Sequence, residues 1–281
     1  MRTAKTVLTV IQERGKQKKP IERVYKLLFN RELYLNAYAK LYPNNGAMTK
    51  GVTNETVDGM SIQKIDRMIE ILREEKYQWK PARREYIKKK NGKKRPLGIP
   101  VWGDKVLQEV MRQILEAYYE PQFSEHSHGF RPNRGCHTAL QEIQVWKGTR
   151  WFIEGDISQY FDTIDHKILL EILARNIHDG RFIRLVSNML KAGYLEEWKF
   201  NQTISGVPQG GVISPILANI YLNEFDNWIE EVLIPKYTKG KRQKSNPEYN
   251  KLTAEIQKLR KEGDAKTAHQ LVVERRKNTF C

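Results

Sequence analysis

The sequence predicts a helix-rich α+β fold that contains a basic β-hairpin, and three patterns lead to this prediction. Apolar residues recur every three or four positions through much of the first 80 residues, as they do along one face of an α-helix. Two short strand-like runs flank Asn91-Gly92, a dipeptide that tolerates the positive φ values of a tight hairpin turn. Further along, an apolar run leads into Asp156, where a strand is expected to give way to a polar turn.

The first 80 residues are expected to form helices on both sides of a polar loop, residues 42–54. The apolar positions at helical spacing are Val24, Leu27, Leu28 and Leu35 before the loop, and Ile62, Ile65, Met68, Ile69 and Leu72 after it. The hairpin follows within residues 86–99, which carry five lysines and one arginine.

Four helices are predicted between the hairpin and residue 235. Asp104 is expected to cap the first, which Pro121 ends and whose apolar stripe comprises Val106, Leu107, Val110, Met111, Ile114, Leu115 and Tyr118. The second starts near Arg134 and carries Leu140, Ile143 and Trp146. Asp165 caps the third, which contains Ile168, Leu169, Ile172 and Leu173. Ser214-Pro215, a cap followed by a proline at the first helical position, begins a long fourth helix through Leu222 and Ile229.

Composition indicates a folded protein that acts in water. A chain of 281 residues with 40% hydrophobic residues can build a core. No stretch approaches the roughly 20 apolar residues of a membrane span, and the apolar run at the N-terminus is too short for a secretory signal. Two cysteines, Cys136 and Cys281, make neither a disulfide framework nor a zinc-binding CxxC pair. We therefore expect a soluble, intracellular protein with no membrane partner.

The net charge of +16 is unevenly distributed along the chain. Residues 1–100 carry 24 Lys and Arg against 10 Asp and Glu, residues 101–235 carry 12 against 18, and residues 236–281 carry 13 against 5. Basic flanks suit a polyanion such as RNA, because each neutralised phosphate releases counterions. An acidic middle suits Mg²⁺ ions that act on that polyanion. Ordinary solvated surface is the alternative interpretation of the lysine-rich faces.

Asp156 is the candidate ligand of a metal ion. Nucleotidyl transfer needs two divalent ions that stabilise the attacking and leaving oxygens, and at least two carboxylates hold such a pair. The Ile157 carbonyl can complete the coordination at the turn. Of the acids nearby, Asp162 and Asp165 also suit turn and cap positions, and Glu154 shares the face of Asp156 only on a regular strand.

A second segment, Gly206-Val-Pro-Gln-Gly-Gly-Val-Ile-Ser-Pro215, begins about forty residues later. Its glycines at positions 206, 210 and 211 let the backbone approach a ligand closely, and the Gln209 amide is placed to hydrogen-bond a nucleotide. A glycine-rich turn before a helix is the alternative. His126, His128 and His137 lack partners at metal-ligand spacing in the sequence and are expected in turn and packing roles.

Residues 25–235 resemble the reverse transcriptases and maturases encoded by group II introns. The resemblance rests on five segments in the family's order: the region from Gly46 to Ser61, Arg95-Pro-Leu-Gly-Ile-Pro100, His128-Gly-Phe-Arg-Pro-Asn-Arg-Gly135, the Asp156 segment and the Gly206 segment. It implies a right-hand polymerase fold, with fingers and an N-terminal extension over residues 1–150, part of a palm over 151–235, and an incomplete, charged helical insertion over 236–281.

The resemblance also implies roles for individual residues. Asp156 is the catalytic metal ligand and Gln209 contacts the nucleotide, while Phe161 packs under the incoming sugar and disfavours a 2′ hydroxyl; a core position is the alternative for Phe161. Lys89 and Arg95 grip the triphosphate, which suits a point charge and a planar fork of donors. The candidate RNA-binding residues are Lys88, Lys90, Lys93, Lys94, Arg131 and Arg134, although the two arginines could instead neutralise buried acids.

Two functions are therefore expected. The first is RNA-directed DNA synthesis with Mg²⁺, dNTPs, an RNA template and a DNA primer. The second is binding of group II intron RNA to assist its splicing, which needs no metal carboxylates. The family's next motif, an aromatic residue, any residue and two aspartates, is missing between Tyr221 and Cys281. We expect this chain to be the N-terminal part of a longer enzyme, unable to polymerise DNA alone, with retron-type relatives and a homodimer as open alternatives.

Overall fold

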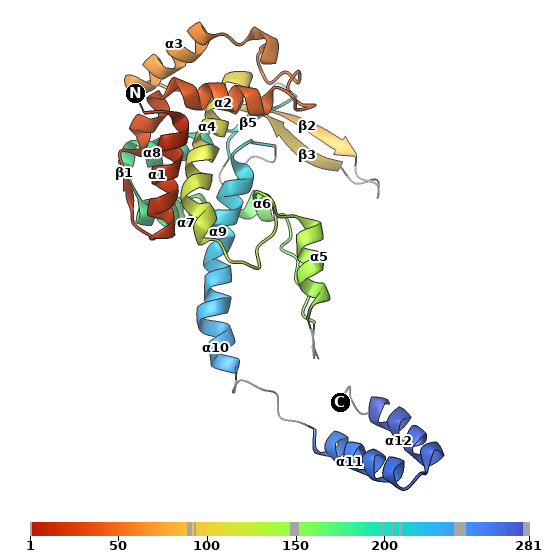
Figure 1. Ribbon diagram of the computed structural model, residues 1–281. Coiled ribbons are helices and arrows are strands. Elements are labelled where there is room, and N and C mark those ends of the chain that lie inside the picture. Colours follow the sequence, from red (N-terminus) through yellow and green to blue (C-terminus); the bar gives the residue numbers. More distant parts are fainter. Residues whose placement is uncertain are drawn as a thin grey trace. The chain divides into compact units, whose positions relative to one another are not determined.

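A computed structural model describes residues 2–88, 92, 94–146, 152–197, 199–203, 205–207, 210–238 and 246–277. Its elements are α1 (Ala4–Lys16), β1 (Ile21–Glu22), the 3₁₀ helix η1 (Val24–Phe29), α2 (Arg31–Leu41), the 3₁₀ helix η2 (Val57–Gly59), α3 (Ile62–Arg73), β2 (Ala82–Lys88), β3 (Lys94–Ile99), α4 (Trp102–Tyr119), the 3₁₀ helix η3 (Glu120–Gln122), α5 (Cys136–Gln144), α6 (Tyr160–Thr163), α7 (His166–Asn176), β4 (Ile177–His178), α8 (Gly180–Leu190), β5 (Tyr194–Glu196), β6 (Lys199–Asn201), α9 (Ser214–Trp228), the π-helix η4 (Ile229–Leu233), α10 (Ile234–Tyr237), α11 (Pro247–Lys261) and α12 (Ala265–Lys277) (Figure 1). The predicted helix-rich α+β class is confirmed.

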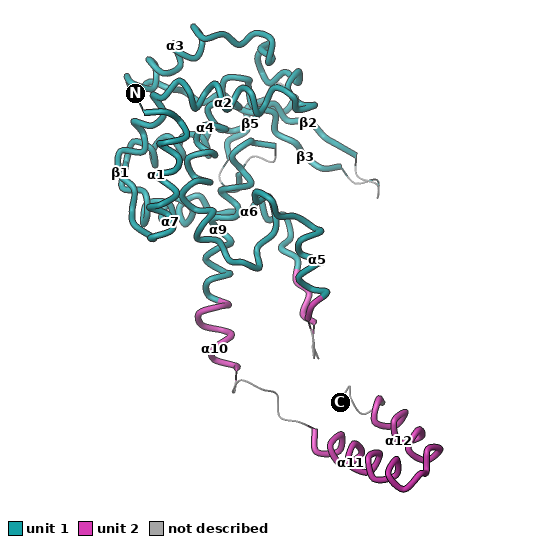
Figure 2. Tube along the Cα trace, in the orientation of Figure 1, with its two compact units in different colours: residues 1–144, 156–228 teal, residues 145–155, 229–281 magenta. Residues whose placement is uncertain are grey.

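The chain divides into two compact units (Figure 2). Unit 1 comprises residues 1–144 and 156–228 and contains both sheets. Unit 2 comprises residues 145–155 and 229–281, and its helices α11 and α12 pack against each other around the buried Ile256 and Ala268. Residues 247–261 and 265–277 are therefore helical.

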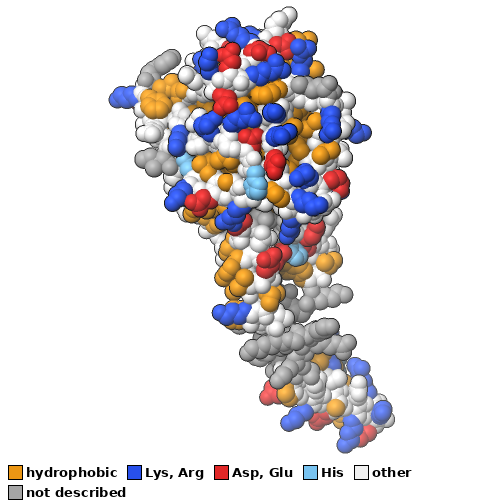
Figure 3. Space-filling model, turned by 90° about the vertical axis from the view of Figure 1, so that its left-hand side faces the viewer, with side chains coloured by type: hydrophobic (Ala, Val, Ile, Leu, Met, Phe, Trp, Pro, Cys, Tyr) orange, Lys and Arg blue, Asp and Glu red, His pale blue; other side chains and the backbone are white. Residues whose placement is uncertain are grey.

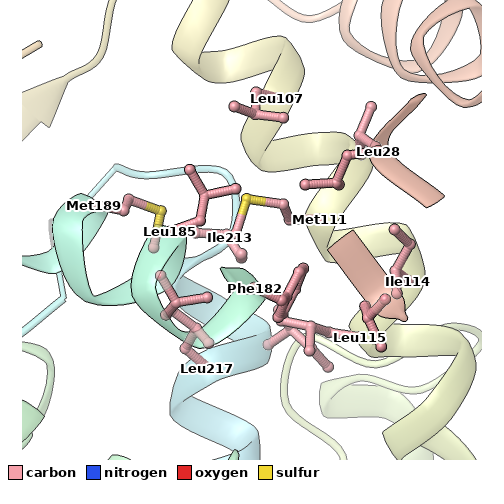
Figure 4. Packing of buried hydrophobic residues seen from close by; sticks show 14 of the residues in the cluster. Leu28, Leu107, Met111, Ile114, Leu115, Phe182, Leu185, Met189, Ile213 and Leu217 are labelled. Carbon is pink, nitrogen blue, oxygen red and sulfur yellow. The ribbon is translucent and has the colours of Figure 1, made fainter. Parts of the chain in front are cut away.

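The core of unit 1 is built around α4. All seven residues of the predicted apolar stripe are fully buried, namely Val106, Leu107, Val110, Met111, Ile114, Leu115 and Tyr118. Side chains from η1, α8 and α9 surround this helix, as Figure 4 shows for Leu28, Phe182 and Leu217. A helix covered on several sides can be apolar around most of its circumference, and α4 is the scaffold on which the remaining elements of unit 1 pack.

Three polar residues on α4 are also buried, and each has a bonded partner. Asp104 accepts hydrogen bonds from Tyr77 Oη (2.6 Å) and from the backbone nitrogen of Lys80 (3.1 Å), just before the hairpin. Gln108 Oε1 accepts one from the nitrogen of Val212 (2.9 Å), just before α9. Glu109 pairs with Arg112 on the same helix. Because a buried polar group is costly unless it is bonded, these contacts fix where the two segments cross α4.

The hairpin belongs to a four-stranded sheet of order β3-β2-β5-β6. Strands β2 and β3 pair antiparallel from Arg83↔Ile99 to Lys88↔Lys94, which confirms the predicted hairpin. Its other edge is extended by β5, which runs parallel to β2, and by β6. A separate pair of short parallel strands, β1 and β4, joins the start of the chain to the end of α7.

Three local predictions about helix starts have different outcomes. Asp165 caps α7 as predicted, since its carboxylate accepts a hydrogen bond from the nitrogen of Ile168 (3.0 Å). Helix α9 begins at Ser214, as its Ser-Pro start predicts. The prediction for Asp104 is wrong, because α4 begins two residues earlier and the carboxylate is buried against Tyr77 and Lys80 instead.

Some apolar residues at helical spacing do not enter the core. Leu35 and Ile62 are exposed on α2 and α3, and α5 exposes Leu140 and Ile143. Helix α5 starts close to the predicted position, but the face on which the prediction depended is not packed in this structure. Periodicity predicts the helix without identifying what covers it.

Charged side chains of both signs cover the face that Figure 3 turns to the viewer, where Lys and Arg are interspersed with Asp and Glu. This face looks like ordinary solvated surface rather than a continuous positive patch. None of the helices in the described residues is both long and apolar enough to span a membrane.

Asp104 should make stability depend on pH. Burial raises the pKa of its carboxyl from the usual 3.8 to about 6, although hydrogen bonds from Tyr77 and Lys80 oppose the shift. A pKa higher in the folded than in the unfolded state means that the stabilisation is present below about pH 4 and is lost as the pH rises through 6. We expect Asp104 to lower the free energy of unfolding by roughly 2.4 kcal/mol between pH 4 and pH 7. Urea denaturation of the wild type and Asp104→Asn across this range should give a difference that changes with pH; parallel curves would contradict the assignment.

Candidate active site

A cavity of about 730 Å³ opens between the hairpin, the short helix α6 and the segment that ends at Val207. Arg84, Lys94 and Arg95 line it on the hairpin side. Phe161 and Asp162 line it from α6, and Ser205, Gly206 and Val207 from the segment. Three regions that lie far apart in the sequence therefore meet around one volume in unit 1.

The hairpin wall is basic. Strand alternation places Arg84, Lys88 and Lys94 on one face, because Arg84 pairs with Gly98 and Lys88 pairs with Lys94. Lys88 and Lys94 lie directly opposite each other, and like charges in that position destabilise an antiparallel pair. An anion bound between the two lysines would relieve their repulsion. The guanidinium of Arg84 lies 3.6 Å from the centre of the Tyr194 ring on β5, so a cation–π contact holds one cation at the edge of the cavity.

The opposite wall is the turn that becomes α6. Gln159 has a φ of +52°, in the left-handed region, and its carbonyl accepts a hydrogen bond from the nitrogen of Asp162 (2.8 Å). Tyr160 Oη donates to the carbonyl of Ala218 on α9 (2.8 Å). Phe161 is half-buried and packs at a steep angle against Tyr160, with 5.7 Å between ring centres. The ring of Phe161 is thus presented to the cavity by a turn that is anchored to α9.

Backbone hydrogen bonds tie this turn to the Gly206 segment. Gly206 donates to the carbonyl of Ile164 (2.8 Å) and Val207 to that of Phe161 (2.7 Å). The buried His166 lies 2.6 Å from the Gly206 carbonyl through Nε2, which must carry the proton because a carbonyl can only accept. The two predicted motifs are therefore held together by direct bonds.

Two glycines of the segment are needed for contacts within the protein. Gly206 has a φ of +87°, and a Cβ there would lie 2.7 Å from the Phe161 carbonyl oxygen. Gly210 has a φ of +102°, and a Cβ there would lie 2.6 Å from the Gly98 oxygen on β3. The prediction that these glycines allow a close approach is right about the backbone, but the approach in this structure is to the chain itself.

Asp156 is exposed, and the strand predicted to deliver it is not formed. Residues 152–157 have no regular secondary structure, and Phe152 and Ile153 are 67% and 94% exposed. Without a regular strand, Glu154 has no reason to share a face with Asp156. Ile157, the other proposed ligand, is also exposed. Among the described residues there is no group of three His, Cys, Asp or Glu that could hold a metal ion.

The two arginines predicted to bind RNA have partners within the protein. Arg131 is buried, its Nε donates to Glu120 (3.0 Å), and its Nη1 donates to the Ser127 carbonyl (2.8 Å). Its guanidinium is therefore not accessible to RNA, and the alternative role, neutralising an acid, is the one seen. Arg134 pairs with the exposed Glu125. Of the other predicted contacts, Lys89, Lys90, Lys93 and Gln209 lie outside the described residues.

His126 and His128 have a carboxylate partner that their sequence spacing did not indicate. Both rings contact Glu142 on α5, and His128 Nε2 lies 2.8 Å from it. The hydrogen bonds from the two histidines lower the pKa of Glu142. These contacts tie the loop before α5 to that helix, in keeping with the expected packing roles.

Sequence reasoning missed three residues that form the cavity. Arg84 and Tyr194 line it as a stacked pair, and Gln159 lines it from the turn before α6. The hairpin register could have indicated Arg84, because alternation from Lys94 and Lys88 leads to it along β2. Nothing in the sequence indicates that β5 pairs with β2, so Tyr194 could not have been found in this way.

Comparison with known proteins matches this chain to one family. Residues 87–242 match the family described as reverse transcriptase (RNA-dependent DNA polymerase). The chain is 47% identical over 239 residues to the group II intron-encoded protein LtrA of Lactococcus lactis subsp. cremoris, a match that covers 84% of this chain and 40% of LtrA.

Further similar proteins are also connected with introns. An uncharacterized 91 kDa protein in the cob intron of Schizosaccharomyces pombe is 43% identical over 285 residues, covering 97% of this chain and 35% of that protein. A putative COX1/OXI3 intron 1 protein of Saccharomyces cerevisiae is 41% identical over 236 residues, covering 83% and 28%. This chain thus spans about two fifths or less of the length of these three relatives.

Gly206→Ala should destabilise unit 1 more than Gly135→Ala does. The new Cβ would require a left-handed alanine and would collide with the Phe161 carbonyl, so we expect a loss of about 2–4 kcal/mol. Thermal unfolding should show a midpoint lower by at least about 5 °C. Gly135→Ala is the matched control, since its Cβ would meet nothing within 4 Å. Equal midpoints for the two variants would show that the close approach at Gly206 is not required.

Proposed function

We propose that this chain, which belongs to the reverse transcriptase (RNA-dependent DNA polymerase) family, supplies the fingers and the first palm motifs of an intron-encoded enzyme that copies RNA into DNA. In this proposal residues 1–150 are the fingers with their N-terminal extension, residues 151–235 are part of the palm, and residues 236–281 are a charged helical insertion. The substrates are dNTPs, an RNA template and a DNA primer.

One observation carries the proposal: Arg84 and Lys94, on one face of the hairpin, line a single cavity together with Phe161, and the neighbouring Arg95 also lines it. Arg84, Lys94 and Arg95 offer the positive charge that a triphosphate requires, and the arginines add planar sets of donors. Phe161 offers a flat apolar ring against which a sugar can pack. The cavity of about 730 Å³ falls in the usual range for ligand pockets.

Mg²⁺ is the proposed cofactor, and Asp156 with the Ile157 carbonyl would hold it. Both are oxygen donors of the kind that Mg²⁺ prefers, and both residues are exposed, five and four positions before Phe161. A pair of such ions stabilises the attacking and leaving oxygens of the transfer. Since a pair needs at least two carboxylates, we propose that the others come from elsewhere in a longer polypeptide, and that this chain alone does not polymerise.

Binding of intron RNA is the second proposed function. Its support is the exposed pair of lysines, Lys88 and Lys94, at the outer end of the hairpin, whose mutual repulsion an RNA phosphate would relieve. Arg131 is left out of this surface because it is buried. A group II intron RNA is the proposed partner, because the relatives carry intron-related names. The bacterial cytoplasm is the proposed location.

Asp156→Ala separates the two functions. We expect it to reduce primer extension by the full-length protein at least about a hundredfold, because a metal ligand is lost. Affinity for intron RNA should change less than about twofold, since the substitution removes no cation. Glu154→Ala is the matched control: it removes an acid from the same segment and should retain activity. A large loss of RNA affinity with Asp156→Ala, or equal loss of extension with Glu154→Ala, would contradict the assignment of Asp156.

Replacing Lys88 and Lys94 together by alanine should weaken RNA binding and its dependence on salt. Each lost phosphate contact lowers the slope of log affinity against log salt by roughly 0.7–0.9, so the slope should fall by up to about 1.8. The control is Lys76→Ala with Lys167→Ala, which removes two exposed lysines that lie beside Glu74 and Glu171. Affinity measured at several salt concentrations tests this, and an unchanged slope would exclude the hairpin as a phosphate-binding surface.

A further inference from the structure

The loop between η3 and α5 carries an exposed aromatic residue in an unfavourable backbone conformation. Phe130 has a φ of +56°, in the left-handed region that a bulky residue seldom occupies. Its side chain is also 73% exposed, so it gains little from burial. A residue that combines two local penalties points to a role that the fold alone does not provide.

The neighbours of Phe130 hold it in this conformation on both sides. The Gly129 carbonyl accepts a hydrogen bond from Asn219 Nδ2 on α9 (2.8 Å). Arg131 is buried and bonded to Glu120 and to the Ser127 carbonyl. The loop is therefore fixed immediately before and immediately after the phenylalanine, which is how a strained residue persists.

Phe130 contacts the one aromatic ring that α6 presents to the cavity. Its ring lies edge-on to that of Phe161, with 6.4 Å between centres and 86° between planes, a favoured geometry for aromatic pairs. Phe161 lines the cavity and Phe130 does not. Tyr160 packs against the same ring and is itself bonded to the Ala218 carbonyl. Two anchored aromatics thus contact Phe161 and restrict how its ring can turn.

We propose that Phe130 is a positioning residue, which sets the orientation of the Phe161 ring and thereby the discrimination between deoxyribonucleotides and ribonucleotides. The inference rests on the proposed function, because it needs Phe161 to pack under the sugar. A ring free to tilt leaves room for a 2′ hydroxyl, whereas a ring held from its edge does not. Phe130, in the loop from Ser124 to Gly135, then acts on the cavity through its contact with Phe161, although Phe130 itself does not line the cavity.

The test is nucleotide selection by the full-length protein carrying Phe130→Ala. We expect the ratio of kcat/KM for a dNTP to that for the matching rNTP to fall about three- to tenfold, which is the range that one aromatic pair supplies. The dNTP kcat should stay within about twofold, so that the change lies in KM and in selection. Phe130→Tyr keeps the ring and should keep the selection, whereas Leu140→Ala removes another exposed apolar side chain, 62% exposed on α5, and should change nothing.

Double substitution distinguishes positioning from direct contact. Once Phe161→Ala has removed the ring, adding Phe130→Ala should reduce selection no further, because the two residues act as one unit. Additive effects would overturn the proposal. Weaker primer-template binding with unchanged selection would overturn it too, and would identify Phe130 as a stacking surface for nucleic acid.

Failure of the underlying function gives a different result. If Phe161→Ala leaves selection unchanged while primer extension persists, the assignment of the sugar-contacting ring is wrong and the inference falls with it. If the full-length wild type extends no primer, the proposed polymerase activity itself is wrong. Unchanged selection in Phe130→Ala beside a clear effect of Phe161→Ala would overturn the role of Phe130 alone.

Discussion

Unit 1 depends on the burial of polar side chains along α4. A carboxylate or an amide in an apolar interior is costly unless its hydrogen bonds are made. Each such group therefore restricts the position of the segment that supplies its hydrogen-bond partner. Asp104 restricts the segment before the hairpin through Lys80, and Gln108 restricts the segment before α9 through Val212. The first segment leads into the hairpin, and the second follows Ser205, Gly206 and Val207, so the core helps to position two parts of the cavity lining.

The walls are then joined to each other by the backbone. Gly206 and Val207 donate hydrogen bonds to the turn that carries Phe161, and Gly210 approaches β3 so closely that no side chain fits there. The segment from Gly206 to Gly210 thus contacts α6 at one end and the hairpin at the other.

The sequence was most informative where one physical requirement dominated. The stripe on α4 was predictable because a helix buried on several sides is apolar at every core position, and the hairpin was predictable because Asn-Gly turns need positive φ. Asp104 illustrates the limit: an acid in the first turn of a helix usually faces solvent or caps the helix, and here the hydrogen bonds from Tyr77 and Lys80 make a buried carboxylate possible. Likewise, a glycine pattern indicates close approach without identifying the partner.

Long-range pairing explains the other differences. The apolar run before Asp156 has strand character, but a strand exists only when another strand pairs with it, and no described residue of unit 1 pairs with Asp156. Arg131 looked like an RNA contact because its motif is basic, yet Glu120, eleven residues earlier, neutralises it in a buried position. Tyr194 could not be predicted from the sequence, because it reaches the cavity only through the parallel pairing of β5 with β2.

Several local penalties lie near the cavity. The core of α4 is fully buried and its polar groups Asp104, Gln108 and Glu109 are bonded. Near the cavity, Lys88 faces Lys94 across the hairpin, and Phe130 and Gln159, which both precede Phe161 in the sequence, adopt left-handed conformations. A chain selected only for stability would replace such residues, because each has a less costly alternative at its position. Such residues beside one cavity are the pattern expected where binding rather than folding determines the residue.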